Sequence, residues 1–173
     1  MDVRFLNPFV DAAAEVLKVE VKTDLSRGSI SMHNGSFTTD DVTVLINLVG
    51  QIQGVVMYEL SKETGLAFVS KMLGQTFTEF DSLAQSGVAE LGNVISGKAT
   101  VEMSKAGLDS TISPPTMIIG KGTQISTVDF PRVLVPLITE LGNVTVHLSL
   151  RENVKDQPHI SFVPLIQKAV SKQ

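Results

Sequence analysis

The chain has 173 residues, 43% of them hydrophobic and 18% charged, which is enough to bury the core of one ordinary folded domain. The net charge is −4 and the cations are scattered, so nucleic-acid binding, which needs several converging cations, is not expected. The absence of cysteine excludes disulfides and thiolate catalysis. The first residues do not resemble a secretory signal, and no apolar run approaches the roughly 20 residues that span a bilayer. We therefore expect a cytoplasmic protein with no membrane segment.

The first third of the chain predicts one helix followed by strands. A helix is expected over residues 4–17, where apolar residues recur at helical spacing, with Pro8 in the first turn (Phe5, Phe9, Ala12, Ala13, Val16 and Leu17). Asn34-Gly35 favours a tight turn, so the short segments on either side are expected to pair as a hairpin. Two further strands, rich in Val, Ile and Leu, should be antiparallel neighbours. The four expected strands are residues 29–33, 36–39, 41–49 and 54–60.

Two more helices and two strand pairs are predicted further along. Ser61 can cap a helix over 62–73, which Gly74 ends, and Asp81 can cap a long helix that runs to Ala106 before Gly107. After Pro114-Pro115 the expected strands are residues 116–119, 124–128, 132–139 and 144–150. The apolar segment of the tail after Arg151 fits either a helix or a strand.

These elements predict an α+β fold, with two long helices and a shorter one packed on a largely antiparallel sheet. A loose repetition of a helix followed by strands suggests a diverged internal duplication. We expect one domain over residues 1–173, in which 151–173 form a C-terminal extension.

The long helix has one polar face composed mainly of small residues. At about 100° per residue, this face lies within roughly 40° of one line, opposite an apolar face. The polar face contains Ser86, Glu90, Asn93, Gly97 and Thr100, and the apolar face contains Val88, Leu91, Ile95, Ala99 and Ala106. Small residues around an acid and an amide suit either a close approach by a partner or packing against a second helix. The spacing alone leaves both interpretations open.

Three features of this region resemble the CheC/CheX/FliY phosphatase family. They are Glu90-Leu-Gly-Asn93 as a Glu-x-x-Asn motif, Ser86 four residues before the Glu, and Pro114-Pro115-Thr116 twenty intervening residues after the Asn. The opening helix and the order of the strands are also similar, over roughly residues 1–150. The resemblance implies a CheC/CheX-like fold with the acid/amide pair on an exposed helix face.

The resemblance also implies the activity and the partner. The chain would hydrolyse the aspartyl phosphate of a CheY-like response regulator, with Asn93 orienting the attacking water and Glu90 pairing with the regulator's lysine. Ser86 and Gly97 would face this partner. No cofactor of its own is implied, since Mg²⁺ would belong to the regulator, and a homodimer is implied by CheX. The alternative is a non-catalytic module that binds a response regulator or serves as a flagellar-switch-like scaffold.

Other patterns are set aside. A second Glu-Leu-Gly-Asn at 140–143 lies between two predicted strands, so we expect a turn there and one site per chain. Residues 92–99 nearly match a phosphate-binding P-loop, but Ala99 replaces the required Ser or Thr and the periodicity is helical. The three histidines lack metal-ligand spacing and are expected to be structural or exposed (His33, His147 and His159). For Lys98 we expect a solvated side chain rather than a contact with an acidic partner.

Overall fold

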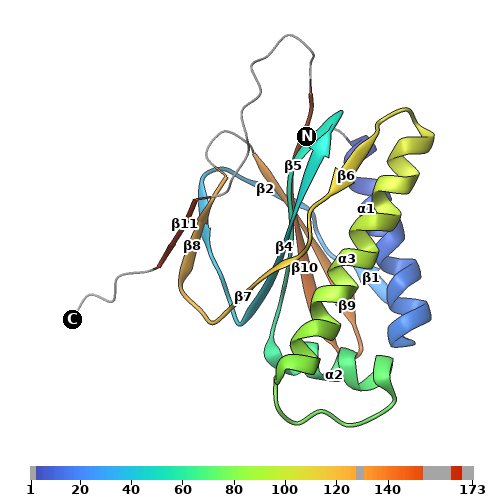
Figure 1. Cartoon of the computed structure of the whole chain (residues 1–173), viewed down its shortest axis with the longest axis vertical. Coiled ribbons are helices and arrows are strands. Elements are labelled where there is room, and N and C mark those ends of the chain that lie inside the picture. Colours follow the sequence, from blue (N-terminus) through green and yellow to red (C-terminus); the bar gives the residue numbers. More distant parts are fainter. Residues whose placement is uncertain (1–2, 128–130, 154–164, 169–173) are drawn as a thin grey trace.

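The computed structural model describes residues 3–127, 131–153 and 165–168. They form three layers: helices, a large central sheet, and a small second sheet on its opposite face (Figure 1). None of the helices in these ranges is long and apolar enough to cross a membrane. The helices are α1 (Val3–Val16), which continues into a π-helical turn (Leu17–Val21), α2 (Lys62–Leu73) and α3 (Ser82–Lys105).

The central sheet is built on four long antiparallel strands in the order β9, β10, β5 and β4. Short strands extend it at both sides: β1 and β2 pair with β9, and β6 and β7 pair with β4. The strands of this sheet are β1 (Leu25–Arg27), β2 (Ser31–His33), β4 (Val42–Gly50), β5 (Ile52–Leu60), β6 (Ser110–Ile112), β7 (Thr116–Ile119), β9 (Arg132–Thr139) and β10 (Gly142–Glu152). The second sheet has the order β11 (Leu165–Lys168), β8 (Thr123–Ser126) and β3 (Ser36–Thr38). The predicted α+β class, with a largely antiparallel sheet, is therefore confirmed.

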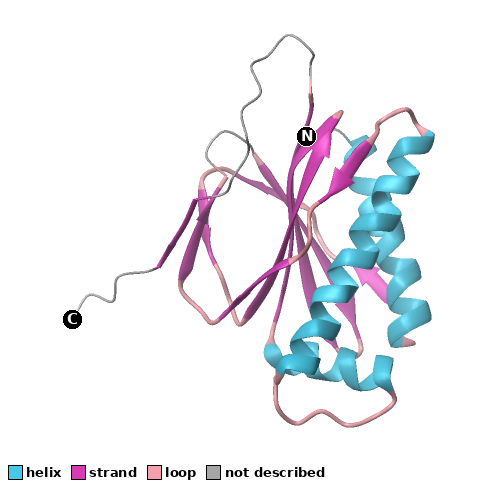
Figure 2. Ribbon diagram, in the orientation of Figure 1, coloured by secondary structure: helices cyan, strands magenta, loops and turns pink. Residues whose placement is uncertain are grey.

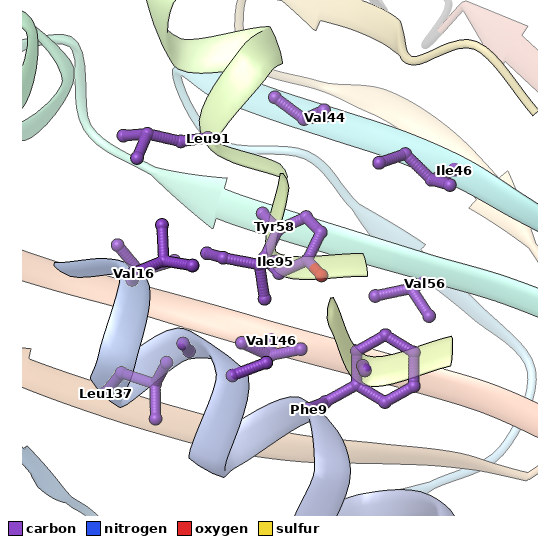
Figure 3. Close-up of a cluster of buried hydrophobic side chains, with 14 of the residues drawn as sticks. Phe9, Val16, Val44, Ile46, Val56, Tyr58, Leu91, Ile95, Leu137 and Val146 are labelled. Atoms are coloured by element: carbon purple, nitrogen blue, oxygen red, sulfur yellow. The ribbon is translucent and has the colours of Figure 1, made fainter. Parts of the chain in front are cut away.

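The two faces of the central sheet have separate cores. In Figure 2 the helices lie on one side of the sheet, with α1 and α3 alongside each other and α2 across one end. Alternate strand residues such as Val44, Ile46 and Tyr58 pack under these helices (Figure 3). The intervening residues form a smaller core with Ile125 of β8 (Leu45, Val55 and Met57). Because both faces are covered, the strand sequences of β4 and β5 are apolar almost throughout.

The hairpin predicted at Asn34-Gly35 is wrong. Gly35 does adopt a positive φ of 81°, as a turn residue would, but β2 pairs with β9 and β3 pairs with β8 in the other sheet. The physical reason lies in Phe37 on β3, which packs against the smaller core and stacks on His147 with the ring centroids 4.7 Å apart. An isolated two-stranded hairpin would leave this ring without a hydrophobic partner.

Several predicted boundaries also change. Strands β1 and β6 were not predicted, and β5 begins at Ile52, so only Gln51 separates it from β4. Strand β8 ends at Ser126, and the last residue of its predicted range, Val128, lies outside the described residues. Of the C-terminal extension, β11 is a strand, and residues 154–164 and 169–173 also lie outside the described part. The internal duplication stays a prediction.

Candidate functional site

Helix α3 has well-defined ends that follow from local sequence. Asp81 is its N-cap, with the carboxylate Oδ1 accepting a hydrogen bond from the backbone N–H of Ala84 at 2.8 Å. At the other end, Lys105 is the last helical residue and Gly107 adopts a φ of 76°. The helix has 24 residues, or about 36 Å of length at 1.5 Å per residue. Nine of its residues are buried: Ala84, Val88, Leu91, Gly92, Ile95, Ser96, Ala99, Thr100 and Met103.

Two contacts hold the middle of α3 close to the central sheet. A Cβ built on Gly92 would lie 3.0 Å from Cγ1 of Val44 and 3.1 Å from Cδ2 of Tyr58, so the absence of a side chain allows the close approach. One turn later, the hydroxyl groups of Tyr58 and Ser96 share a buried hydrogen bond of 2.8 Å. Together these contacts fix the rotation of α3 about its axis, which directs the opposite face outward.

That outward face carries the predicted acid/amide pair. Glu90 is exposed, Asn93 is half-buried, and Nδ2 of Asn93 donates to Oε2 of Glu90 at 3.4 Å. The distance is long for a charge-assisted hydrogen bond, so either group can exchange this contact for a partner. Ser86 is exposed on the same face, where its hydroxyl donates to the Ser82 carbonyl at 2.8 Å. Half-buried Gly97 lies one turn beyond Asn93.

Two residues were placed on the wrong face by the helical projection. Thr100 is buried, with 8% of its surface exposed, and its hydroxyl donates to the Gly97 carbonyl at 2.8 Å. It is buried because the contact surface of α3 is wider near its C-terminal end, where β6 also packs against it. Ala106 is exposed because the helix ends at Lys105, so a helical projection does not apply to it.

A groove of about 620 Å³ lies between α1 and α3 and adjoins the acid/amide pair. Asn93 and Gly97 form part of its wall, and the lining residues that sequence reasoning did not assign to the site lie on α1, on α3 and, for Ile112, on β6. The lining residues are Asp11, Ala12, Glu15, Asn93, Val94, Gly97, Lys98, Val101, Glu102 and Ile112. The one available signal was the pair of acids four residues apart on α1, Asp11 and Glu15.

Lys98 connects the two helices across this groove. Its ammonium Nζ donates to Oε1 of Glu15 at 2.5 Å, and both side chains are about half exposed. The expected solvated lysine is therefore partly wrong, because Lys98 holds an ion pair with α1. An exposed pair of this kind contributes at most about 1 kcal/mol to stability, so its role is more to orient the two side chains.

The glycine at position 97 is not required by packing. A Cβ built there would meet only Cδ1 of Ile112, at an ordinary contact distance of 3.9 Å, whereas Gly87 and Gly92 are tightly packed. A glycine in a helix interior costs about 1 kcal/mol relative to alanine. Gly97 therefore leaves helix backbone accessible, and no packing contact within the described chain offsets its lower helix propensity.

The patterns set aside in the sequence lie elsewhere. Glu140 and Leu141 form the turn between β9 and β10, as predicted, and Glu140 and Asn143 are exposed. Residues 92–99 are helical, which rules out a P-loop. The described part of the chain has no group of three His, Asp or Glu residues that could hold a metal ion.

The histidines fit the structural expectation where they are described. His33 is exposed, and His159 lies outside the described residues. His147 is buried beneath the second sheet, with Nε2 3.1 Å from the carboxylate of Glu59. Burial disfavours the charged form of Glu59, but the hydrogen bonds from His147 and from the Asp40 N–H outweigh this and lower the pKa of Glu59. These groups lie on the sheet face opposite α3, so they take no direct part in the acid/amide site.

The fold is an α+β domain in which helices cover one face of a largely antiparallel sheet, with an acid/amide pair on the outward side of α3, and comparison with known proteins shows its family. The profile of the chemotaxis phosphatase CheX family matches residues 42–138, and the chain belongs to this family. The matched segment runs from β4 into β9 and contains Glu90 and Asn93, but not α1.

Individual relatives extend the similarity over most of the chain. The chain is 27% identical to the CheY-P phosphatase CheX of Thermotoga maritima over 152 residues, which are 87% of this chain and 98% of that protein. It is similar to the crystal structure of a CheC-like superfamily protein from Shewanella sp. PV-4, with a TM-score of 0.79, 27% identity and 87% and 99% of the two chains covered. A CheX–CheY–BeF3–Mg²⁺ complex from Borrelia burgdorferi shares the fold, with a TM-score of 0.68, 24% identity and 86% and 98% coverage.

Proposed function

We propose that this protein hydrolyses the aspartyl phosphate of a CheY-like response regulator, with Glu90 and Asn93 as its active site. The observation that carries the proposal is the acid/amide pair on the outward face of α3, beside an open groove, in a member of the CheX family. The CheY-P phosphatase of Thermotoga maritima and the CheX–CheY complex of Borrelia burgdorferi support the choice of partner.

The chemistry of the two side chains suits this reaction. Transfer of a phosphoryl group to water needs mainly the positioning of the water and neutralisation of charge. The Asn93 amide can both donate to and accept from one water molecule, so it can align that water with the phosphorus. Glu90 can accept from the regulator's lysine. When it does, Asn93 loses its weak 3.4 Å contact with Glu90 and is free to hold the water.

The cofactor requirement is assigned to the partner. Mg²⁺ is expected on the regulator, where it would neutralise the phosphoryl oxygens, and the residues proposed to act in this chain are an acid and an amide. The complex from Borrelia burgdorferi contains BeF3 and Mg²⁺ together with CheX and CheY. In this proposal Glu90 docks the regulator and Asn93 orients the attacking water.

Ser86 and Gly97 are proposed to contact the regulator on either side of the pair. Both are small, and among the described residues a Cβ at Gly97 would meet only the Cδ1 methyl of Ile112, at 3.9 Å. Gly97→Ala should raise the free energy of unfolding by about 0.5–1 kcal/mol, because alanine is the better helix former. The same change should weaken the regulator's docking and raise KM. A variant that is more stable and equally active would remove Gly97 from the contact surface.

The decisive experiment follows the decay of a phosphorylated CheY-like regulator with and without this protein. The wild type should accelerate decay, and Asn93→Ala should slow the catalysed rate by about 100-fold while binding is largely kept. The chain provides a matched control in Asn143, the last residue of the second Glu-Leu-Gly-Asn, which is exposed at the start of β10. Asn143→Ala should leave the rate unchanged. Binding without acceleration would instead support the non-catalytic scaffold.

We also propose, from the family resemblance, that the chain is a cytoplasmic homodimer. Sedimentation equilibrium at micromolar concentration should give twice the chain mass of 18.6 kDa. A single chain mass over the accessible concentration range would overturn the dimer without affecting the proposed chemistry.

A further inference from the structure

The groove between α1 and α3 has an excess of negative charge. Its lining contains three carboxylates and one ammonium group, a formal net charge of −2 (Asp11, Glu15, Glu102 and Lys98). Two of the carboxylates are already paired: Glu15 with Lys98 at 2.5 Å, and Glu102 with Lys105 at 2.6 Å. The exposed Asp11 carboxylate has no hydrogen bond or ion pair with any other described residue. Asp11 is therefore the carboxylate of this groove that is left for a partner.

Apart from Asn93, the uncharged side chains that line the groove are apolar. Val101 is 57% exposed, and Val94 and Ile112, which line the same groove, are half-buried. An apolar wall next to an unpaired acid matches the side chain of lysine or arginine. The carbon stem of such a side chain packs on apolar surface while its charged end reaches an acid.

The groove is also continuous with the proposed active site, since Asn93 and Gly97 belong to its wall. A regulator that docks over Asn93 would therefore cover part of the groove. Its volume of about 620 Å³ exceeds what one long side chain needs. Helix α1, which lacks a Glu-x-x-Asn motif of its own, would then contribute to binding and not to chemistry.

We propose that the regulator inserts a lysine or arginine side chain into this groove, with its stem against Val101 and its charge beside Asp11. This cation is a different group from the lysine assigned to Glu90, and the inference rests on the proposed function. Asp11 is then a specificity-determining residue that recognises a basic residue of the regulator without touching the phosphoryl group.

The test compares steady-state hydrolysis of the phosphorylated regulator by the full-length variants Asp11→Asn and Asp11→Lys. At low ionic strength KM should rise about threefold for the neutral variant and about tenfold or more for the lysine variant, with kcat changed less than twofold. The difference should shrink in about 0.5 M salt, because screening weakens an exposed charge pair. Val101→Ala should raise KM about threefold, and this effect should not depend on salt.

Glu140→Lys is the matched control, since it changes the charge equally at an exposed carboxylate in the β9–β10 turn. Its KM should equal that of the wild type. Equal increases for the Asp11 and Glu140 variants would show an effect of net charge, and unchanged KM for both would leave Asp11 without a role; either result overturns the inference. If Asp11→Lys proves unstable, the nearly isosteric Asp11→Asn decides. The proposed function fails separately, when the wild type and Asn93→Ala both leave regulator decay unaccelerated.

Discussion

The buried hydrogen bond between Tyr58 and Ser96 offers a direct test of how α3 is held on the sheet. The two hydroxyl groups are 2.8 Å apart; Ser96 is fully buried and Tyr58 is 3% exposed. In Ser96→Ala the Tyr58 hydroxyl loses its partner in a site without access to water. Leaving such a group unsatisfied costs about 1–3 kcal/mol. Alanine recovers about 0.5 kcal/mol through helix propensity, so the net loss should be about 0.5–2.5 kcal/mol.

The substitution of the other partner, Tyr58→Phe, should lower the free energy of unfolding by less than Ser96→Ala does. Tyr58→Phe removes the buried hydroxyl and leaves the Ser96 hydroxyl, which can turn to the backbone carbonyl four residues earlier. The expected loss is about 0.5–1.5 kcal/mol. Because both single changes remove the same bond, the double variant should lose about 1 kcal/mol less than the sum of the two.

The assay is urea unfolding followed by circular dichroism, supported by thermal melting. For a chain of this size, 1 kcal/mol shifts Tm by about 2–4 °C, so Ser96→Ala should melt roughly 1–10 °C below the wild type. Ser86→Ala is the control, since this exposed serine of the same helix bonds only to its own backbone, and the change should stay within about 0.5 kcal/mol. Additive effects of the two changes, within about 0.3 kcal/mol, would refute the coupling and with it this account of how α3 is held.

The same bond has a pH signature. Burial raises the pKa of Tyr58 well above its ordinary value of 10.0, although the hydrogen bond with Ser96 opposes the shift. The unfolded chain therefore releases this proton first as the pH rises. The contribution of the neutral phenol is complete below about pH 10 and is lost at higher pH, so Tyr58→Phe should flatten the alkaline fall in Tm.

Three further predictions concern other parts of the fold. Gly92→Ala should lower the free energy of unfolding by about 1 kcal/mol, opposite in sign to Gly97→Ala, because its methyl group would press on the sheet; equal signs in urea unfolding would contradict this. The pKa of Glu59 is lowered, so its pairing with His147 should stabilise the fold above about pH 4.5 and less below that pH. His147→Gln should therefore reduce the fall in Tm as the solution is made more acidic. An unchanged fall in Tm would count against the pair. Asp81→Ala removes the N-cap of α3 and should cost about 1 kcal/mol, or about 2–4 °C in Tm, measured by calorimetry; a Tm within 1 °C would show that the cap contributes little.

The sequence by itself determined the features that depend on neighbours a few residues away. The ends of α3 follow from Asp81 and Gly107, and the period of a helix places Glu90 and Asn93 on one side. The second Glu-Leu-Gly-Asn was recognisable as a turn because both flanks have the pattern of strands. In each case the residues that determine the local structure are near neighbours in the sequence.

Tertiary structure decided what depends on residues far apart in the sequence. Strands β2 and β3 are adjacent in the chain, yet Phe37 of β3 pairs with Ile125 of β8, more than eighty residues away, so the two strands enter different sheets. Thr100 is buried because β6 packs near it, which no helical projection includes. The groove beside Asn93 exists because α1, about eighty residues earlier, lies along α3 and brings Asp11 and Glu15 to the site. Local patterns could identify the acid/amide pair, but only long-range packing could supply the surface around it, since burial is set by contacts between distant segments.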